Sequence, residues 1–125
     1  MNYSIPVIYV WIGTPLPPWC KESLKFSSDN NPKRKFILLS DSDKSRLNFA
    51  KDLINVESIN IKNNLNKSKI FQSKNLFKGK FWKYTSLRFE VLNDFLLENN
   101  IKRFFHAEID NLLFNFDELE KELDK

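Results

Sequence analysis

The sequence IPVIYVWIG, residues 5–13, decides the fold. Its first eight residues are almost all apolar and rich in β-branched and aromatic side chains, and Gly13 follows them directly. A strand that is buried on both faces has this pattern, and such strands belong to parallel sheets covered by helices. We therefore expect a central strand here that ends in a turn at Gly13.

The segments that follow alternate between helical and strand patterns. The further strands are expected at residues 36–39, 54–61 and 101–109. The helices are expected at residues 19–28, 43–52 and 81–99, within an otherwise irregular segment 62–80, and from Asn115 or Asp117 onward. Alternation at this spacing predicts a three-layer α/β/α, Rossmann-like domain with a mostly parallel sheet of about four strands. We expect a single domain over residues 1–125.

The composition allows a core and gives a modest positive charge. Of the 125 residues, 42% are hydrophobic and 14% aromatic, which argues against wholesale disorder. The net charge of +4, from 20 basic and 16 acidic residues, suits an anionic small ligand or weak nucleic-acid contact. Because the basic residues form no run of five or more, we expect no nucleic-acid partner. The densest group, Lys33-Arg34-Lys35, is expected to lie solvated at a strand entrance.

The single cysteine and the first residues exclude several classes of protein. Cys20 cannot form a disulfide or a cysteine-based zinc site within one chain, and we expect it to be a small buried hydrophobe. No basic segment precedes the apolar run 5–12, which is also too short to span a membrane. We expect a cytoplasmic protein without a transmembrane segment.

Two carboxylates at the end of the expected strand 101–109 are candidate metal ligands. Glu108 and Asp110 are two residues apart, so on a strand they share a face with His106. Neighbouring carboxylates repel unless a cation or a base neutralises them, and hard oxygen ligands favour Mg²⁺ or Mn²⁺. The alternative is a solvated acidic turn in which His106 is hydrogen-bonded in the core.

Arg88 and Asp41 are the other candidate site residues. Arg88 lies within the apolar stripe of the helix 81–99, and a buried guanidinium needs a fixed anionic partner. That partner is either Glu108 or Asp110 in an internal ion pair, or a ligand phosphate. Asp41 follows the second strand, where it either caps the next helix or contacts a ligand at the carboxyl ends of the strands.

Two long segments carry a resemblance to a known family. They are IPVIYVWIGTPLPPWCKESLKFSSDNNPKRKFILLSD, residues 5–41, and FWKYTSLRFEVLNDFLLENNIKRFFHAEIDNLLF, residues 81–114. Together they resemble the N-terminal, DXD-containing, nucleotide-sugar-binding half of bacterial GT-A-fold glycosyltransferases. In that family a first strand ends in a W-x-G turn, a second strand ends in an acidic residue, and a helix and a strand lead into the DXD motif.

The resemblance implies a set of site residues. Glu108 and Asp110 stand at the DXD carboxylates, which implies that they hold Mn²⁺ or Mg²⁺ on the diphosphate of a UDP- or GDP-linked sugar. The implied nucleotide-sugar-binding residues are Trp11, Ile12, Gly13, Asp41, Lys83, Thr85, Arg88 and Glu108. No catalytic base is implied by position. The sequence departs from the family pattern in having Glu at the first DXD position and no Gly-Gly pair before the strand.

The implied activity is that of a glycosyltransferase, or of its donor-binding half, which moves a hexose to an acceptor hydroxyl. The metal stabilises the leaving diphosphate. Family members usually continue past the motif with an acceptor-binding half, so we expect a truncated form that self-associates or needs a partner chain. An apolar stripe in the last helix, formed by Phe116, Leu119 and Leu123, is expected to be uncovered. The alternatives are a non-catalytic remnant and, less well supported, a basic nucleic-acid-binding module.

Overall fold

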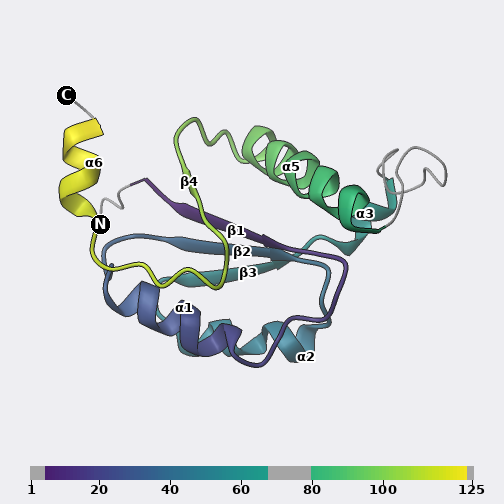
Figure 1. The fold of residues 1–125 in the computed structure, drawn as a ribbon, viewed down its shortest axis with the longest axis horizontal. Coiled ribbons are helices and arrows are strands. Elements are labelled where there is room, and N and C mark those ends of the chain that lie inside the picture. Colours follow the sequence, from purple (N-terminus) through teal and green to yellow (C-terminus); the bar gives the residue numbers. More distant parts are fainter. Residues whose placement is uncertain (1–4, 68–79, 124–125) are drawn as a thin grey trace.

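A four-stranded sheet forms the centre of the molecule (Figure 1). The computed structural model describes residues 5–67 and 80–123. The strands are β1 (Val7–Trp11), β2 (Phe36–Ser40), β3 (Val56–Asn60) and β4 (Phe105–His106). Their order is β3-β2-β1-β4, and every pair is parallel. The expected α/β fold with a parallel sheet of four strands is therefore confirmed.

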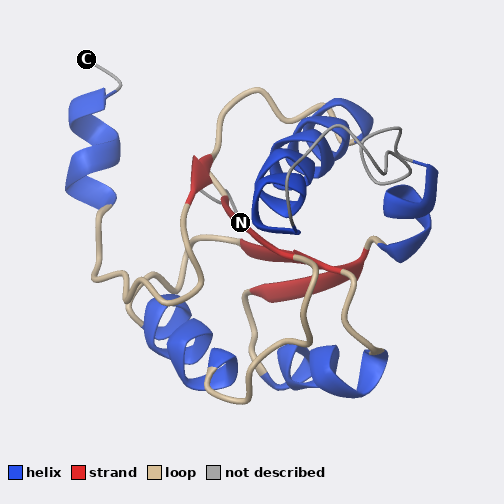
Figure 2. Cartoon of the chain, turned by 45° about the vertical axis from the view of Figure 1, so that its right-hand side comes forward, coloured by secondary structure: helices blue, strands red, loops and turns tan. Residues whose placement is uncertain are grey.

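Helices cover both faces of this sheet (Figures 1 and 2). On one face lie α1 (Cys20–Asp29), α2 (Lys44–Leu47) and the 3₁₀ helix η1 (Asn48–Asp52). On the other lie α3 (Lys62–Lys67) and α5 (Lys80–Glu98). The last helix, α6 (Asp117–Leu123), stands beyond the end of the sheet at which the strands begin. Within the described ranges, no helix combines the length and the apolar character that crossing a membrane requires.

The core is divided by the sheet into two apolar clusters. Tyr9, Phe36 and Leu38 point toward α1, whereas Ile8 and Leu39 point toward α5. Every residue of β2 is buried, because this strand has a neighbour on each side and a helical layer on each face. The continuous apolar pattern of the first two strands follows from this position.

The fourth strand is much shorter than the expected strand 101–109. β4 contains only Phe105 and His106, which pair with Val7 and Ile8 of β1. The chain then turns, and the N–H of Asn111 donates to the carbonyl of Glu108 at 3.0 Å. Beyond this turn the chain runs back along α1 instead of continuing the sheet (Figure 1).

Arg34 corrects the expectation that the group of residues 33–35 is solvated. Lys33 and Lys35 are exposed, but Arg34 is 1% exposed. Its guanidinium donates to the carbonyl of Ile5 at 2.6 Å, to Asp117 at 2.9 Å and to Glu120 at 3.1 Å. A buried arginine needs such partners, and here they attach α6 to the body of the domain.

The apolar stripe of the last helix is only partly uncovered. Phe116 lies 4.0 Å from the Arg34 guanidinium and packs edge-on against Phe105, with ring centroids 5.1 Å apart. The expectation of an uncovered stripe is therefore wrong for Phe116. It is confirmed for Leu119 and Leu123, which are 53% and 59% exposed.

Two buried ionisable groups predict a loss of stability at alkaline pH. Burial, with a smaller contribution from Glu22, raises the pKa of the Cys20 thiol from 9.0 to about 12. Burial likewise raises the pKa of Tyr9 from 10.0 to about 12. Both groups keep their protons up to a higher pH in the folded state than in the unfolded chain. Their ionisation in the unfolded chain therefore lowers the free energy of unfolding progressively between about pH 9 and about pH 12.

Urea unfolding at a series of pH values checks this expectation. Cys20→Ala should be less stable than the parent near neutral pH, but its free energy of unfolding should fall less steeply above about pH 9. A Cys20→Ala curve parallel to the parent curve over this range would contradict the assigned role of the thiol.

Candidate functional site

The turn after β1 is fixed by two contacts. The indole Nε1 of Trp11 donates to the carbonyl of Thr14 at 3.0 Å. The N–H of Gly13 donates to Asp41 Oδ2, at the end of β2, at 3.3 Å. Asp41 therefore joins the ends of the two central strands. It does not cap the next helix, because the residue at the N-cap of α2 is Asp43.

Two neighbouring hollows lie at the carboxyl ends of the strands. The first hollow, about 370 Å³, is lined by Gly13, Thr14, Pro15, Asp41, Ser42, Asp43, Arg46 and Lys62. The second hollow, about 330 Å³, is lined by Val10, Trp11, Ile12, Thr14, Tyr84, Thr85, Arg88 and Glu108. They share Thr14, and each has the size of a small-molecule site. Parallel α/β sheets bind their ligands at this edge.

The cationic group of the second hollow is Arg88. Its guanidinium donates to Glu108 Oε1 at 2.8 Å, so the internal ion pair considered from the sequence is present. The Arg88 side chain is 25% exposed and that of Glu108 is 60% exposed. Within the described part of the chain, Arg88 Nε is buried and has no hydrogen-bond partner. The guanidinium therefore lines the second hollow, and one of its sides is paired with the solvent-accessible carboxylate of Glu108.

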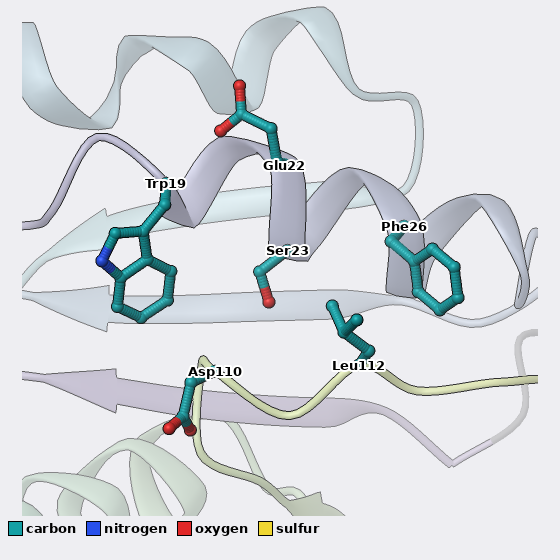
Figure 3. Close-up of a pocket in the computed structure, with 6 residues that line it drawn as sticks. All are labelled: Trp19, Glu22, Ser23, Phe26, Asp110 and Leu112. Atoms are coloured by element: carbon teal, nitrogen blue, oxygen red, sulfur yellow. The ribbon is translucent and has the colours of Figure 1, made fainter.

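Glu108 and Asp110 lie in different hollows. Because β4 ends at His106, both carboxylates follow the strand, and the rule that residues two apart share a face does not apply. Glu108 lines the second hollow, whereas Asp110 lines a third one beside α1 (Figure 3). Among residues 5–67 and 80–123, no three His, Cys, Asp or Glu side chains are grouped closely enough to hold a metal ion. The two carboxylates therefore line different hollows, and whether they share a metal ion stays a prediction.

His106 takes the structural role considered from the sequence. Its Nδ1 lies 2.8 Å from the carbonyl of Ile8, an arrangement in which the ring donates to the neighbouring strand. Because the carbonyl can only accept, Nδ1 carries the proton of this hydrogen bond. His106 thereby fixes β4 against β1 rather than lining either hollow.

Most of the predicted site residues gather around the two hollows. Those that line the hollows are Trp11, Ile12, Gly13, Asp41, Thr85, Arg88 and Glu108. Asp110 lies elsewhere, and Lys83 belongs to α5 but its side chain lies outside the described part of the structure.

Eight residues that line the two hollows are not among the predicted site residues: Val10, Thr14, Pro15, Ser42, Asp43, Arg46, Lys62 and Tyr84. Arg46 and Lys62 follow the second and third strands closely along the chain. The rule that ligands bind beyond the carboxyl ends of parallel strands could have indicated both basic residues. Tyr84 stands one helical turn before Arg88 in the apolar stripe of the helix, and nothing in the helical spacing distinguishes a core position from one at the rim of a hollow.

Gly13 makes the close approach between the β1 turn and α5 possible. Its φ angle is +94°, and a Cβ added there would lie 2.9 Å from Cγ of Tyr84. Gly13→Ala is expected to destabilise the domain by about 1–3 kcal/mol, because the left-handed backbone is strained for alanine and the Tyr84 ring must move. Urea unfolding measures this cost, with exposed Thr14→Ala as the control. Equal stability of Gly13→Ala and the parent would show that the turn relaxes freely.

No family model, curated protein or solved structure matches this chain significantly.

Proposed function

We propose that this chain is the nucleotide-sugar-binding domain of a GT-A-type glycosyltransferase. The observation that carries the proposal is the pair of neighbouring hollows that share Thr14, one lined by Asp41 and the other by Arg88. Arg46, Lys62 and Arg88 supply positive charge along this edge. An extended ligand with polar and anionic parts suits this arrangement better than a compact one.

The first hollow is assigned to the nucleoside. Asp41 is half-buried, and its carboxylate is an acceptor for ribose hydroxyl groups. Arg46 is held by a hydrogen bond from Nη1 to the carbonyl of Leu16 at 3.0 Å, and Lys62 stands at the start of α3. These two cations favour a ligand whose phosphates leave the hollow toward Thr14.

The second hollow is assigned to the diphosphate and the sugar. The Arg88 guanidinium is the group that phosphate oxygens would contact, since it forms strong charge-assisted hydrogen bonds with phosphates. A bound phosphate competes with Glu108 for Arg88, which is feasible because Glu108 is 60% exposed and can turn to solvent. The proposal assigns donor binding to this domain; the transfer of a hexose to an acceptor hydroxyl needs groups beyond those lining the hollows.

Calorimetric titration with UDP, GDP and their hexose conjugates tests the proposal. Arg88→Met is expected to weaken nucleotide binding at least about tenfold, because a charge-assisted contact to phosphate is lost. Arg103→Met is the matched control, since Arg103 is exposed and lines neither hollow. Failure of every nucleotide to bind the parent protein, or unchanged affinity in a folded Arg88→Met variant, would overturn the proposal.

The same titration in Mn²⁺ and in chelator examines the metal expectation separately. If Mn²⁺ strengthens binding and Asp110→Ala removes the gain, Asp110 must leave the hollow beside α1 when the nucleotide binds. Equal affinity in Mn²⁺ and in chelator would make the metal expectation wrong and leave the nucleotide proposal intact.

A further inference from the structure

A third hollow lies between α1 and the turn that follows β4 (Figure 3). It measures about 450 Å³ and is lined by Trp19, Glu22, Ser23, Phe26, Asp110 and Leu112. The Ser23 hydroxyl donates to the carbonyl of Ile109, which holds the turn against the helix. The hollow is therefore built by a side-chain contact between segments far apart in the sequence.

The walls of this third hollow are apolar and aromatic. Trp19 and Leu112 are 45% and 54% exposed, and Phe26 is half-buried beside them. The Trp19 ring is held edge-on against Trp11, with centroids 6.2 Å apart and planes at 88°. This contact restrains the orientation of the indole, and Trp19 remains 45% exposed, so a ligand can reach the ring without a large loss of side-chain freedom.

The charged groups of the third hollow are all acidic. Glu22, on α1, and Asp110, on the turn, both belong to the lining, but the Glu22 carboxylate points away from the turn and from Asp110 (Figure 3). Among the residues described as its lining there is no Lys, Arg or His, although the whole chain carries a net charge of +4. The local field therefore favours positive ligands and repels phosphates and carboxylates.

Donor and acceptor chemistry narrows the ligand class further. A sugar hydroxyl both donates and accepts, so a sugar site needs donors as well as acceptors. The hydroxyl that lines this hollow, that of Ser23, already donates to Ile109. A cation with an apolar body needs only acceptors, an aromatic face and apolar walls, which are the groups supplied here.

We propose that the third hollow binds a small organic cation, a primary or quaternary ammonium group on an apolar body. The ammonium lies over the Trp19 ring beside Asp110, and the apolar body contacts Phe26 and Leu112. This site is separate from the nucleotide hollows, and its test uses no nucleotide.

The test compares three probes with the same apolar body and different charge. The ¹⁵N-labelled protein is titrated in chelator with 2-phenylethylamine, 2-phenylethanol and phenylacetate, and with methyl glucoside as a sugar probe, while amide and indole signals are followed by NMR. We expect the amine to bind most tightly and to shift the Trp19 indole signal and the amides of residues 110–112. Equal binding of amine and alcohol, preferential binding of the sugar, or shifts confined to other residues would overturn the proposal.

Two variants identify the groups responsible. Asp110→Asn keeps the shape and removes the charge, and Trp19→Leu keeps an apolar wall and removes the aromatic face. Each is expected to weaken amine binding about fivefold, the effect of one partly exposed charge or cation–π contact. Glu118→Gln is the control, because Glu118 is exposed on α6 and its removal changes net charge equally. If Trp19→Leu does not fold, Asp110→Asn decides alone, and unchanged affinity in that variant contradicts the proposal.

Discussion

Replacing Arg34 by Met is expected to lower the free energy of unfolding by about 3–5 kcal/mol, because one partner of a buried ion pair is removed while the other remains. Glu120, which is 13% exposed, would lose the guanidinium that lies 3.1 Å from its Oε2. Phe116 would lose the cation that lies 4.0 Å from its ring. Urea unfolding followed by circular dichroism measures the change.

Lys33→Met is the matched control for this variant. Lys33 is the exposed neighbour of Arg34, so its replacement removes the same charge without opening a buried contact. A change within about 0.5 kcal/mol is expected for such a surface position. If Arg34→Met were as stable as Lys33→Met, the contacts between Arg34 and α6 would not contribute to stability.

Asn31→Asp is expected to be the second highly destabilising substitution. Asn31 is 1% exposed, and its Nδ2 donates to the carbonyl of Ser27 at 2.9 Å and to those of Leu113 and Phe114 at 3.3 Å. An aspartate of the same shape places a carboxylate oxygen against these three carbonyls. An uncompensated buried charge costs about 3–5 kcal/mol, and we expect a loss of that order near neutral pH.

The pH dependence of this loss provides an internal check. Repulsion from the carbonyls raises the pKa of the introduced carboxyl in the folded state, so the folded protein binds the proton more tightly than the unfolded chain does. The loss in free energy of unfolding relative to the parent should therefore be smaller near pH 4 than near pH 7. Asn93→Asp, at an exposed position of α5, should show neither the loss nor its pH dependence.

The central strands could be predicted because their pattern is local. Both β1 and β2 are covered on two faces, so almost every residue had to be apolar, and the parallel arrangement followed. The length of β4 could not be predicted in this way. Residues 101–109 have the composition of a strand, but the chain leaves the sheet after the pairing of His106 with Ile8. Where a strand stops depends on its partner, which the segment itself does not encode.

Arg88 and Arg34 show that side-chain contacts, too, can be predicted only where the local sequence reveals them. Arg88 was recognisable because it interrupts an apolar stripe at helical spacing, and its pairing with Glu108 was one of the expected alternatives. Arg34 stands between two exposed lysines, so its surroundings in sequence predict a solvated position. Its acidic partners lie on α6, more than eighty residues later, and no local pattern reveals them.

The contacts of Arg34 also have a consequence for the order of folding. The hydrogen bond between Ile5 and Glu120 joins residues separated by 115 positions, and Arg34 binds both of these residues. Closing so long a loop costs much chain entropy before any contact compensates for it. During synthesis, the strands β1 to β3 can assemble before residues 117–120, which include the acidic partners of Arg34, have been made. We infer that this junction forms after the rate-limiting step, so weakening it should accelerate unfolding more than it slows folding.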